Sequence, residues 1–393
     1  MWINRYIFKL VRSAFQQFPA LIITGPRQTG KTAGVRYLFP DAAYVSLDFL
    51  DEARRAGEDP KGFLGRFHEP LIIDEIQYAP GFLRYLKGVI DQDRRPGRFI
   101  ITGSQPFQLM EGVTESLSGR AAIIRMPTLM TAEILAARSE EKFTFKDCLW
   151  LGGFPELHAG KGIDPGLWFP SYLSTCIERD IRNLLHVSNL SDFERFVRAV
   201  AARSGQILNI ADLARDIGVA PNTAKKWLSL LETSGQVSRL EPYYRNITKR
   251  LVKSPKIYFN DTGLLCYLLG VGSKDQLIGS PLLGALWETY VYSELMKSFW
   301  SAGAKPSLWF WRTQTGEEID FLIEQAGVFS LIEAKYSSQP NERQAQNIFV
   351  KFEKEYGVSM VGKKMIASTS ESPYPGGNGI IIHPGWDWSS PTL

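Results

Sequence analysis

Residues 20–32, ALIITGPRQTGKT, join an apolar run to a glycine-containing loop and then to a lysine–threonine pair. Gly25 and Gly30 allow tight turns, and the amides of such a loop at a helix N-terminus can surround phosphate oxygens. At this spacing Lys31 would neutralise the β- and γ-phosphates, and Thr32 would ligate Mg²⁺. The residues expected around the nucleotide are Gly25, Pro26, Arg27, Gln28, Thr29, Gly30, Lys31 and Thr32. The sequence therefore predicts a site for ATP and Mg²⁺, with the Arg27 side chain at its surface.

Two further apolar runs end in polar residues that suit the same chemistry. In PLIIDEIQ (70–77), Asp74 is expected to support the magnesium ion and Glu75 to act as the base that orients water on the γ-phosphate. The alternative for this pair is a strand followed by a solvated acidic turn. In RFIITGSQ, Ser104 and Gln105 are placed to hold the attacking water or to sense the γ-phosphate.

An arginine follows in ESLSGRAAIIRM, where Arg120 begins another apolar run. An arginine beside a phosphate site can stabilise the charge that develops during hydrolysis, in the same chain or from a neighbouring subunit of a homo-oligomer. The alternative is a surface residue at the edge of a strand.

These apolar strands alternate with helical stretches, which predicts an α/β fold with a parallel sheet and helices on both faces. The segment MWINRYIFKLVRSAF has helical apolar spacing, and we expect an amphipathic helix packed on this first domain rather than a signal peptide.

Near the other end of the chain, GEEIDFLIEQAGVFSLIEAKYS (316–337) reads as a hairpin that carries carboxylates and a lysine. With a turn at EQAG, Ile323 pairs with Val328, Glu318 lies opposite Glu333, and Asp320 is diagonal to Glu333. Two such carboxylates can share a divalent ion, Mg²⁺ or Mn²⁺. Lys335 follows on the same face and could steady an attacking water. Glu288, on a preceding helix, offers a further ligand, and plain cross-strand charge pairing is the alternative. Either Glu318 or Asp320 could be the hairpin's acidic ligand.

Between these sites, residues 204–250 show the pattern of a helix-turn-helix with a wing. A helix, a turn at Gly218, a second helix capped near Asn222 or Thr223, and an extended segment at 237–240 follow in order. The expected core consists of Leu213, Ile217, Trp227, Leu228 and Leu231. The expected DNA contacts are Lys225, Lys226, Arg239 and Arg245, followed by Lys249, Arg250, Lys253 and Lys256. A packing or oligomerisation module is the alternative.

The composition is that of a globular protein with two or three domains, with 393 residues, 44% hydrophobic residues and a net charge of +4. Such a small charge means that any basic surface must arise from local clustering. Three scattered cysteines, Cys148, Cys176 and Cys266, lack metal-ligand spacing and indicate reduced core residues in a cytoplasmic protein. No apolar run is long enough to predict a membrane span.

Residues 20–135 resemble an AAA+-type ATPase core, with GPRQTGKT, LIIDE, IITGSQ and SLSGR in order. Together with GGFPEL (152–157), YLSTCIERDIRNL (172–184) and KSPKIYFNDTGLLCYLLG (253–270), the chain resembles a prokaryotic P-loop ATPase family with a C-terminal domain of unknown function. Glu288, Asp320, Glu333 and Lys335 are also similar to the restriction-endonuclease-like PD-(D/E)xK fold, although Ile319 replaces the proline of that name. In that resemblance the acidic residues bind magnesium and the lysine assists phosphodiester hydrolysis.

The expected domains are an ATPase core (1–135), a helical lid or connector (136–200), a winged helix (201–252) and a nuclease-like α/β domain (253–393). The expected function is ATP hydrolysis that controls a nuclease acting on DNA. The alternative is an ATP-switched regulatory or scaffold protein whose inactive nuclease-like domain binds a protein partner.

Overall fold

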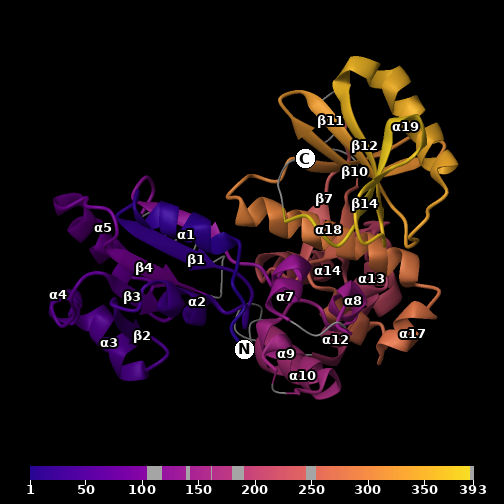
Figure 1. The fold of residues 1–393 in the computed structure, drawn as a ribbon. Helices are drawn as coiled ribbons and strands as arrows, with labels where there is room; N and C mark the ends of the chain where they lie inside the picture. Colours follow the sequence, from indigo (N-terminus) through magenta and orange to yellow (C-terminus); the bar gives the residue numbers. More distant parts are fainter. Residues whose placement is uncertain (104–116, 139–141, 161, 179–189, 245–253, 390–393) are drawn as a thin grey trace.

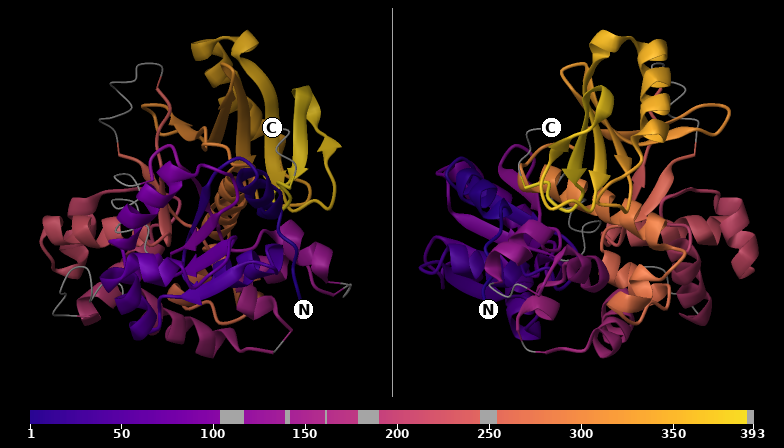
Figure 2. Two further views of the ribbon diagram at one scale, coloured as in Figure 1. Left: turned by 90° about the vertical axis from the view of Figure 1, so that its left-hand side faces the viewer. Right: turned by 45° about the vertical axis from the view of Figure 1, so that its right-hand side comes forward.

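The computed structural model describes residues 1–103, 117–138, 142–160, 162–178, 190–244 and 254–389. Figure 1 shows three regions: an N-terminal α/β body, a helical middle, and a C-terminal sheet. The long helix α18 (Leu283–Ser301) lies between the helical middle and the C-terminal sheet in Figures 1 and 2. Within the described residues, no helix is long and apolar enough to cross a lipid bilayer.

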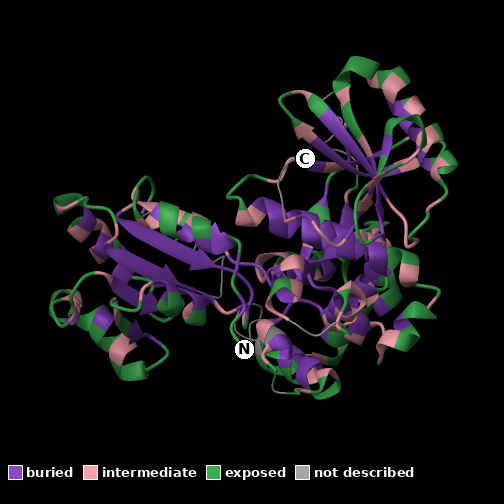
Figure 3. Ribbon diagram, in the orientation of Figure 1, coloured by how far each residue is buried: buried purple, intermediate pink, exposed green. Residues whose placement is uncertain are grey.

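The N-terminal body contains the predicted parallel sheet, in the order β2-β3-β4-β1-β5. Its strands are β1 (Ala20–Thr24), β2 (Ala43–Ser46), β3 (Leu71–Asp74), β4 (Phe99–Thr102) and β5 (Ala121–Arg125). Because side chains alternate along a strand, Leu21 and Ile23 pack against one layer of helices and Ala20 and Ile22 against the other. Figure 3 shows this buried sheet between helices with exposed outer faces.

The helices of the body cover both faces of this sheet, as predicted. They are α1 (Ile7–Phe15), α2 (Lys31–Leu38), α3 (Leu50–Glu58), α4 (Pro60–Leu64) and α5 (Phe82–Gln92), with the short 3-10 turn η1 (Ile76–Tyr78). Helix α1 is the amphipathic helix expected at the N-terminus, and it packs beside α2 in the core that contains Leu21 and Ile23.

The middle region consists of short helices and a small three-stranded sheet, in the order β6-β8-β7. Its helices are α7 (Thr131–Ala137), α8 (Phe145–Leu151), α9 (Pro155–His158), α10 (Pro165–Tyr172), η2 (Leu173–Glu178), α12 (Leu190–Ala201), α13 (Ile210–Ile217), α14 (Pro221–Thr233), α16 (Thr262–Leu268) and α17 (Lys274–Ile278). Its strands are β6 (Gln206–Ile207), β7 (Val237–Leu240) and β8 (Lys256–Phe259). The sheet therefore extends past residue 252, where we expected a boundary.

The predicted core of α13 and α14 is confirmed, because Leu213, Ile217, Trp227, Leu228 and Leu231 are all buried. The turn at Gly218 is also confirmed, with the residue in the left-handed region. The expected cap at Asn222 or Thr223 is wrong. Helix α14 begins earlier, at Pro221, because a proline at the first helical position has no amide hydrogen to leave unpaired.

The C-terminal region is a six-stranded sheet in the order β13-β14-β12-β11-β10-β9. Its strands are β9 (Leu308–Arg312), β10 (Glu318–Gln325), β11 (Val328–Ala334), β12 (Val361–Ser368), β13 (Tyr374–Pro375) and β14 (Ile380–Pro384). Two short 3-10 turns are η3 (Val358–Met360) and η4 (Gly377–Gly379). Helix α19 (Glu342–Tyr356) packs on one face, and α18 packs on the other.

Candidate functional site

The predicted phosphate loop connects β1 to α2 at the carboxyl edge of the parallel sheet. Gly25 has a φ of 143°, and a Cβ atom there would lie 2.2 Å from the carbonyl oxygen of Met126. Only glycine fits this position, since the obstacle is backbone. Gly30 and Gln28 also have positive φ, at 84° and 61°. The loop is thus held in a conformation that ends at the N-terminus of α2, where free amides can bind phosphate.

Lys31 is buried and turned back onto its own loop. Its Nζ donates to the carbonyl oxygens of Gly25 (3.1 Å) and Pro26 (2.8 Å). These contacts place a positive charge inside the loop, where it can attract the terminal phosphates of a nucleotide.

Arg5, which sequence reasoning missed, connects the phosphate loop to the segment after β5. Its guanidinium donates to the carbonyl oxygens of Thr29 (2.9 Å), Pro127 (2.7 Å) and Thr128 (3.0 Å), and it lies 3.6 Å from Glu133. The N-terminal segment is therefore part of the support of the phosphate loop. No local motif marks Arg5, because its partners are more than 20 residues away.

Asp74 lies at the end of β3 and collects three hydroxyl donors. Thr32 Oγ1 lies 2.9 Å and 3.0 Å from its two carboxylate oxygens, Tyr44 donates at 3.0 Å, and Thr102 also donates. Burial raises the pKa of Tyr44 to about 12, and the neighbouring Asp74 carboxylate contributes to the rise. Carboxylate and hydroxyl oxygens of this kind suit Mg²⁺, so Thr32 and Asp74 fit the predicted magnesium site.

Glu75 follows Asp74 in an unusual backbone conformation, with φ 57° and ψ 51°. Its amide donates to Thr102 Oγ1 at 3.2 Å, and its carboxylate accepts a hydrogen bond from Gln77. Non-glycine residues in this region carry backbone strain and are common at functional sites. Thr102, at the tip of β4, therefore contacts both acidic residues. Sequence reasoning chose Ser104 and Gln105 at this tip, and both lie outside the described residues.

A cavity of about 230 Å³ opens beside the phosphate loop. It is bounded by Thr29, Gly30, Ala33 and Gly34 of the loop and α2, by Met1, Trp2, Ile3, Arg5 and Phe8, and by Leu129, Pro155, Glu156 and Ala159. The N-terminal segment and the middle region thus enclose a largely apolar space next to the loop.

Arg120 is not brought to the phosphate loop within this chain. It precedes β5, at the sheet edge opposite the loop, because β5 runs parallel to β1 with Ala121 beside Ala20. Its guanidinium forms two hydrogen bonds of 2.8 Å with Asp91 and holds the pKa of that carboxyl down at about 2. The expectation of a same-chain catalytic arginine fails here, because the residue starts the strand whose far end approaches the loop.

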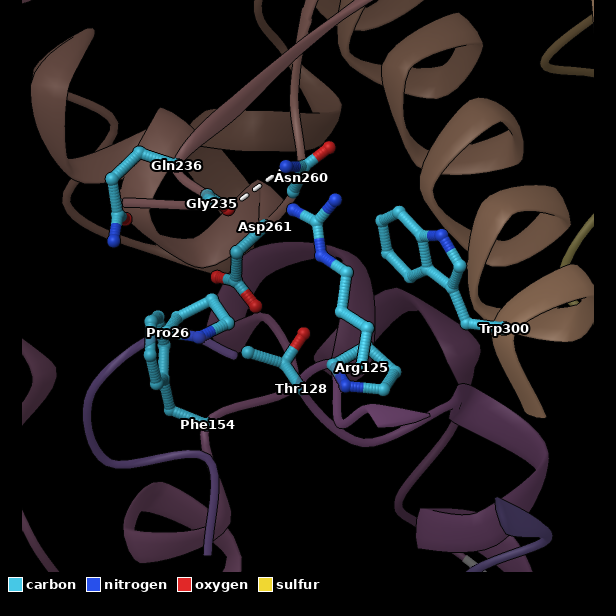
Figure 4. A pocket seen from close by; sticks show the side chains of 10 residues that line it. Pro26, Arg125, Thr128, Phe154, Gly235, Gln236, Asn260, Asp261 and Trp300 are labelled. Carbon is cyan, nitrogen blue, oxygen red and sulfur yellow. Dashed lines mark hydrogen bonds between the residues drawn. The ribbon is translucent and has the colours of Figure 1, made fainter. Parts of the chain in front are cut away.

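The arginine at that far end is Arg125. Figure 4 shows its side chain between Asn260 and the Trp300 ring, above Pro26 and Thr128. Its guanidinium lies 4.3 Å from the centre of the Trp300 ring, and burial lowers its pKa. Arg125 therefore joins the carboxyl edge of the nucleotide sheet to the end of α18.

The phosphate loop also meets the turn between α14 and β7. A Cβ added to Gly235 would lie 2.9 Å from Pro26 Cγ and 3.1 Å from a guanidinium nitrogen of Arg125. The Gly235 carbonyl accepts a hydrogen bond of 2.8 Å from Asn260, drawn in Figure 4. The nucleotide loop thus packs directly on the helical region.

Lys225 and Lys226 are exposed on the first turns of α14, as a DNA-contacting helix requires. Arg239 differs, because its guanidinium is paired with Glu232 at 2.5 Å and 2.8 Å. Arg245, Lys249, Arg250 and Lys253 lie outside the described residues. Lys256 is buried, so it does not extend a basic surface. Its ammonium belongs instead to the acidic centre, the group of carboxylates formed by Glu288, Glu318, Asp320 and Glu333.

The predicted hairpin is present, but its register differs from our expectation by two residues. The turn consists of Ala326 and Gly327, with φ of 51° and 82°, which suits a two-residue hairpin turn. Gln325, not Ile323, therefore pairs with Val328. The expected pairing rested on a four-residue turn at EQAG, whereas the observed turn has two residues.

This shift moves Asp320 next to the end of β11. Its carboxylate accepts a hydrogen bond of 2.8 Å from the amide of Ala334. Between Ile319 and Leu322, the pairing of β10 with β9 slips by one residue, which places a β-bulge at Asp320 and Phe321. Bulges re-aim side chains and are frequent beside active sites.

Asp320 and Glu333 are the buried carboxyl pair of this centre. Burial raises the pKa of Asp320 well above its usual range, and the charges of Glu333 and Glu288 raise it further. Burial also raises the pKa of Glu333, against the effect of Lys335, whose Nζ lies 2.9 Å away. The second oxygen of Glu333, Oε1, is buried and has no hydrogen-bond partner in the part of the chain that the structure describes. Asp320, rather than Glu318, is thus the hairpin carboxylate coupled to Glu333.

Glu288 and Glu318 are held by a lysine that sequence reasoning had assigned to DNA contact. Lys256 Nζ lies 2.8 Å from Glu288 Oε1 and 2.8 Å from Glu318 Oε1. Tyr258 donates to the same Glu288 oxygen at 2.6 Å. Arg312 reaches Glu318 from the outer side at 3.4 Å.

The arrangement of these acids does not form a complete metal site. Across the described ranges, no three His, Cys, Asp or Glu side chains are grouped so that they could hold an ion. Asp320 and Glu333 fit a hard cation by chemistry, but Glu288 is engaged by Lys256 and Tyr258.

Comparison with solved structures gives distant likenesses. The Walker-type ATPase PABY2304 of Pyrococcus abyssi has 12% identity and a TM-score of 0.48, and the match covers 68% of this chain and 96% of that chain. DnaA from Aquifex aeolicus, bound to AMPPCP, has 12% identity and a TM-score of 0.32, over 57% of this chain and 85% of that chain.

Family comparisons divide the chain into three matched segments. Residues 17–135 match an AAA domain, residues 142–275 match a domain of unknown function (DUF8612), and residues 283–387 match a domain of unknown function (DUF4143). The N-terminal body is therefore an AAA-type P-loop domain, which supports ATP binding.

Two mycobacterial proteins are similar over most of the chain. The uncharacterized proteins Rv2008c of Mycobacterium tuberculosis and Mb2031c of Mycobacterium bovis are each 33% identical over 336 residues, or 84% of this chain and 73% of the relative. With its AAA domain and its DUF4143 domain, the protein belongs to the same family as Rv2008c.

Proposed function

We propose that the protein binds ATP with Mg²⁺ and hydrolyses it at the carboxyl edge of the N-terminal sheet. The observation that supports this most strongly is the joint geometry of Lys31, Thr32 and Asp74. A buried ammonium lies inside a glycine-restricted loop, and the threonine hydroxyl is 2.9 Å from the carboxylate at the tip of β3. These groups supply a positive charge for phosphate and oxygen ligands for magnesium within one contiguous site.

In this proposal each residue has a separate role. Lys31 leaves the carbonyls of Gly25 and Pro26 to contact the terminal phosphates, and the loop amides bind the phosphate oxygens. Thr32 and Asp74 hold Mg²⁺, which would neutralise phosphate charge when bound. Glu75 acts as the base that orients the attacking water, with its backbone tied to Thr102.

The base and ribose of the nucleotide are proposed to occupy the 230 Å³ cavity beside the loop. The cavity adjoins Thr29 and Gly30, so a nucleotide anchored by its phosphates would extend into it. Its apolar walls suit the flat face of a purine.

Phosphate release and equilibrium nucleotide binding test the proposal together. Lys31→Ala should abolish ATP binding, whereas Glu75→Gln should bind ATP and hydrolyse it at least a hundredfold more slowly, in keeping with the loss of a general base. Lys61→Ala, at an exposed lysine of α4, is the matched control and should behave as wild type. Wild-type protein that neither binds nor hydrolyses ATP with Mg²⁺ would refute the proposal.

We further propose that the protein acts on DNA through a winged helix formed by α12, α13, α14 and the sheet β6-β8-β7. The exposed pair Lys225 and Lys226 at the start of α14 supports this. Each lysine–phosphate contact contributes about 0.9 to the slope of log affinity against log salt. Removing both should lower that slope by about 2.

Duplex binding measured across a salt series tests this directly. The Lys225→Ala/Lys226→Ala variant should bind more weakly with a reduced slope. The matched control is Lys61→Ala/Lys305→Ala, which removes two exposed lysines outside α14. A wild-type response that is flat in salt, or unchanged in the α14 variant, would reject DNA contact by this helix.

The role of the C-terminal domain has two candidates. In the first, Asp320 and Glu333 would hold a divalent cation, Lys335 would assist phosphodiester hydrolysis, and the nucleotide state would control access of DNA. In the second, the domain is catalytically inactive and binds a protein partner under ATP control. Stimulation of the ATPase by DNA would favour the first, and indifference to DNA would favour the second.

Cleavage assays separate the two further. DNA cleavage that disappears in Asp320→Ala and Lys335→Ala would support the nuclease. Cleavage that persists in both variants would indicate a contaminant, and absence of cleavage with ATP and Mn²⁺ would favour the partner-binding role.

A further inference from the structure

The acidic centre contains a second lysine whose position differs from that of Lys335. Lys256 is only 1% exposed, yet it carries a full charge among carboxylates. Burial alone would lower its pKa, but the charges of Glu288, Asp320 and Glu318 together raise the pKa above its usual value. Its ammonium is therefore charged at neutral pH. A buried charge is stable only when it is paired, and the carboxylates provide that pairing.

Lys256 and its neighbour Tyr258 reach the centre from β8, not from the C-terminal sheet. Residues two apart on a strand face the same side, and both side chains converge on Glu288 Oε1 at 2.8 Å and 2.6 Å. The same ammonium contacts Glu318 at 2.8 Å. Strand β8 pairs with β7, the strand that follows α14, and Leu240 of β7 lies opposite Lys256. The middle region thus inserts a cation into the centre of the C-terminal domain.

The centre has an excess of negative charge, but it offers a cation only two carboxylates. Glu288, Glu318, Asp320 and Glu333 carry four negative charges when ionised, and Lys256, Lys335 and Arg312 return three positive ones. The remaining negative charge favours the binding of a cation. Glu333 Oε1 is buried and has no hydrogen-bond partner among the described residues, so this oxygen is available to a bound cation. Glu288 is turned to Lys256 instead, so a cation beside Asp320 and Glu333 would find only two carboxylates.

We propose that Lys256 is the resident counter-ion of the acidic centre and competes with a divalent cation for Glu288. A divalent cation then binds with its full ligand set only when the Lys256 ammonium leaves Glu288. Since Lys256 belongs to β8, a shift of that strand relative to α18 would release the site. This inference rests on the proposal that the centre can hold a divalent cation, and it identifies the residue that limits binding.

Titration of nucleotide-free protein with Mn²⁺, monitored by the electron paramagnetic resonance of free Mn²⁺, tests the inference without an activity assay. Lys256→Met removes the competing charge and frees Glu288, so the affinity for Mn²⁺ should rise on the order of tenfold or more. Asp320→Asn in that background should remove the added binding. Lys256→Arg keeps the charge and should show no gain.

Lys335→Met is the charge-matched control, because it removes one lysine from the same centre but leaves Glu288 held by Lys256. A larger gain in Lys256→Met than in Lys335→Met supports competition for Glu288. Equal gains would overturn it, because they would report charge alone. Wild-type protein that already binds as tightly as Lys256→Met would overturn the inference while the metal centre stands. Absence of Mn²⁺ binding in every variant would overturn both.

The Lys256→Met variant removes the buried cation between Glu288 and Glu318, which keep only Tyr258 and Arg312 as partners, and this loss can prevent folding. Lys256→Gln covers that case, since its amide can still donate to one glutamate but carries no charge. It should also bind Mn²⁺ more tightly than wild type, and its thermal unfolding temperature should rise with Mn²⁺ more than that of Lys335→Gln. Equal shifts in the two variants would contradict the inference.

Discussion

The contact between the phosphate loop and the helical region predicts a specific effect of Gly235→Ala. Gly235 has a φ of 75°, and its new Cβ would lie 2.9 Å from Pro26 Cγ and 3.1 Å from Arg125. Gly218 has nearly the same φ, 80°, but a Cβ there would meet no atom of the described residues within 4 Å. Both substitutions place an L residue in the left-handed region, at a cost of roughly 1–2 kcal/mol. Only Gly235→Ala adds overpacking against the loop.

Overpacking of a filled site costs about 1–3 kcal/mol, so Gly235→Ala should lower the free energy of unfolding by that much more than Gly218→Ala. The clash also pushes on Pro26, whose carbonyl oxygen accepts from Lys31 at 2.8 Å. We therefore expect weaker ATP binding in Gly235→Ala and unchanged binding in Gly218→Ala. Urea unfolding and a fluorescent ATP-analogue titration measure the two effects. Equal destabilisation with equal ATP affinity would refute the proposed contact.

Three further predictions follow from buried hydrogen bonds and charges. Tyr44→Phe removes one donor to Asp74, and the Mg²⁺ concentration for half-maximal ATPase should rise about fivefold, as expected for about 1 kcal/mol; an unchanged requirement would contradict this. Burial lowers the pKa of His158 to about 4. The contribution of the neutral imidazole to the free energy of unfolding is therefore fully present above the unfolded pKa of about 6.5, and about 3 kcal/mol of it is lost as the pH drops to 4. His158→Gln should flatten the pH dependence of the free energy of unfolding between pH 6.5 and 4, measured by urea unfolding. The same pH dependence in the variant and in wild type would contradict the role given to His158. Arg5→Ala removes the donor to the Thr29 carbonyl of the phosphate loop and to the carbonyls of Pro127 and Thr128 after β5, and should weaken ATP binding more than Arg54→Ala, an exposed arginine of α3.

Local sequence patterns were sufficient for the nucleotide loop and its sheet. The alternation of apolar strands with helices identified β1, β3, β4 and β5, and the spacing of Gly25, Gly30 and Lys31 identified the loop. The strands and the loop depend on residues that are neighbours in the chain, so local sequence patterns are enough to predict them. Which arginine reaches the loop depends instead on strand direction, and Arg120 and Arg125 lie at opposite ends of one strand.

The acidic centre illustrates what local patterns could not provide. The hairpin and its acidic residues were predictable, but the turn at Ala326 and Gly327 required knowledge of two positive φ angles, one of them at alanine. Lys256 stands in KIYF, where its basic neighbours favoured a DNA-contact interpretation. Its partners Glu288 and Glu318 are 32 and 62 residues away. Only the packing of β8 against α18 and β10 reveals that pairing.

A crystal structure with Mg²⁺ and a non-hydrolysable ATP analogue tests the central claim of ATP binding at the loop most directly. The account predicts phosphate oxygens on the amides of residues 25–32, Lys31 turned from the Pro26 carbonyl to the γ-phosphate, and Mg²⁺ beside Thr32 and Asp74. It also predicts the purine in the cavity bounded by Trp2, Ala33 and Pro155. A nucleotide bound elsewhere, or a metal ion away from Thr32, would contradict the account.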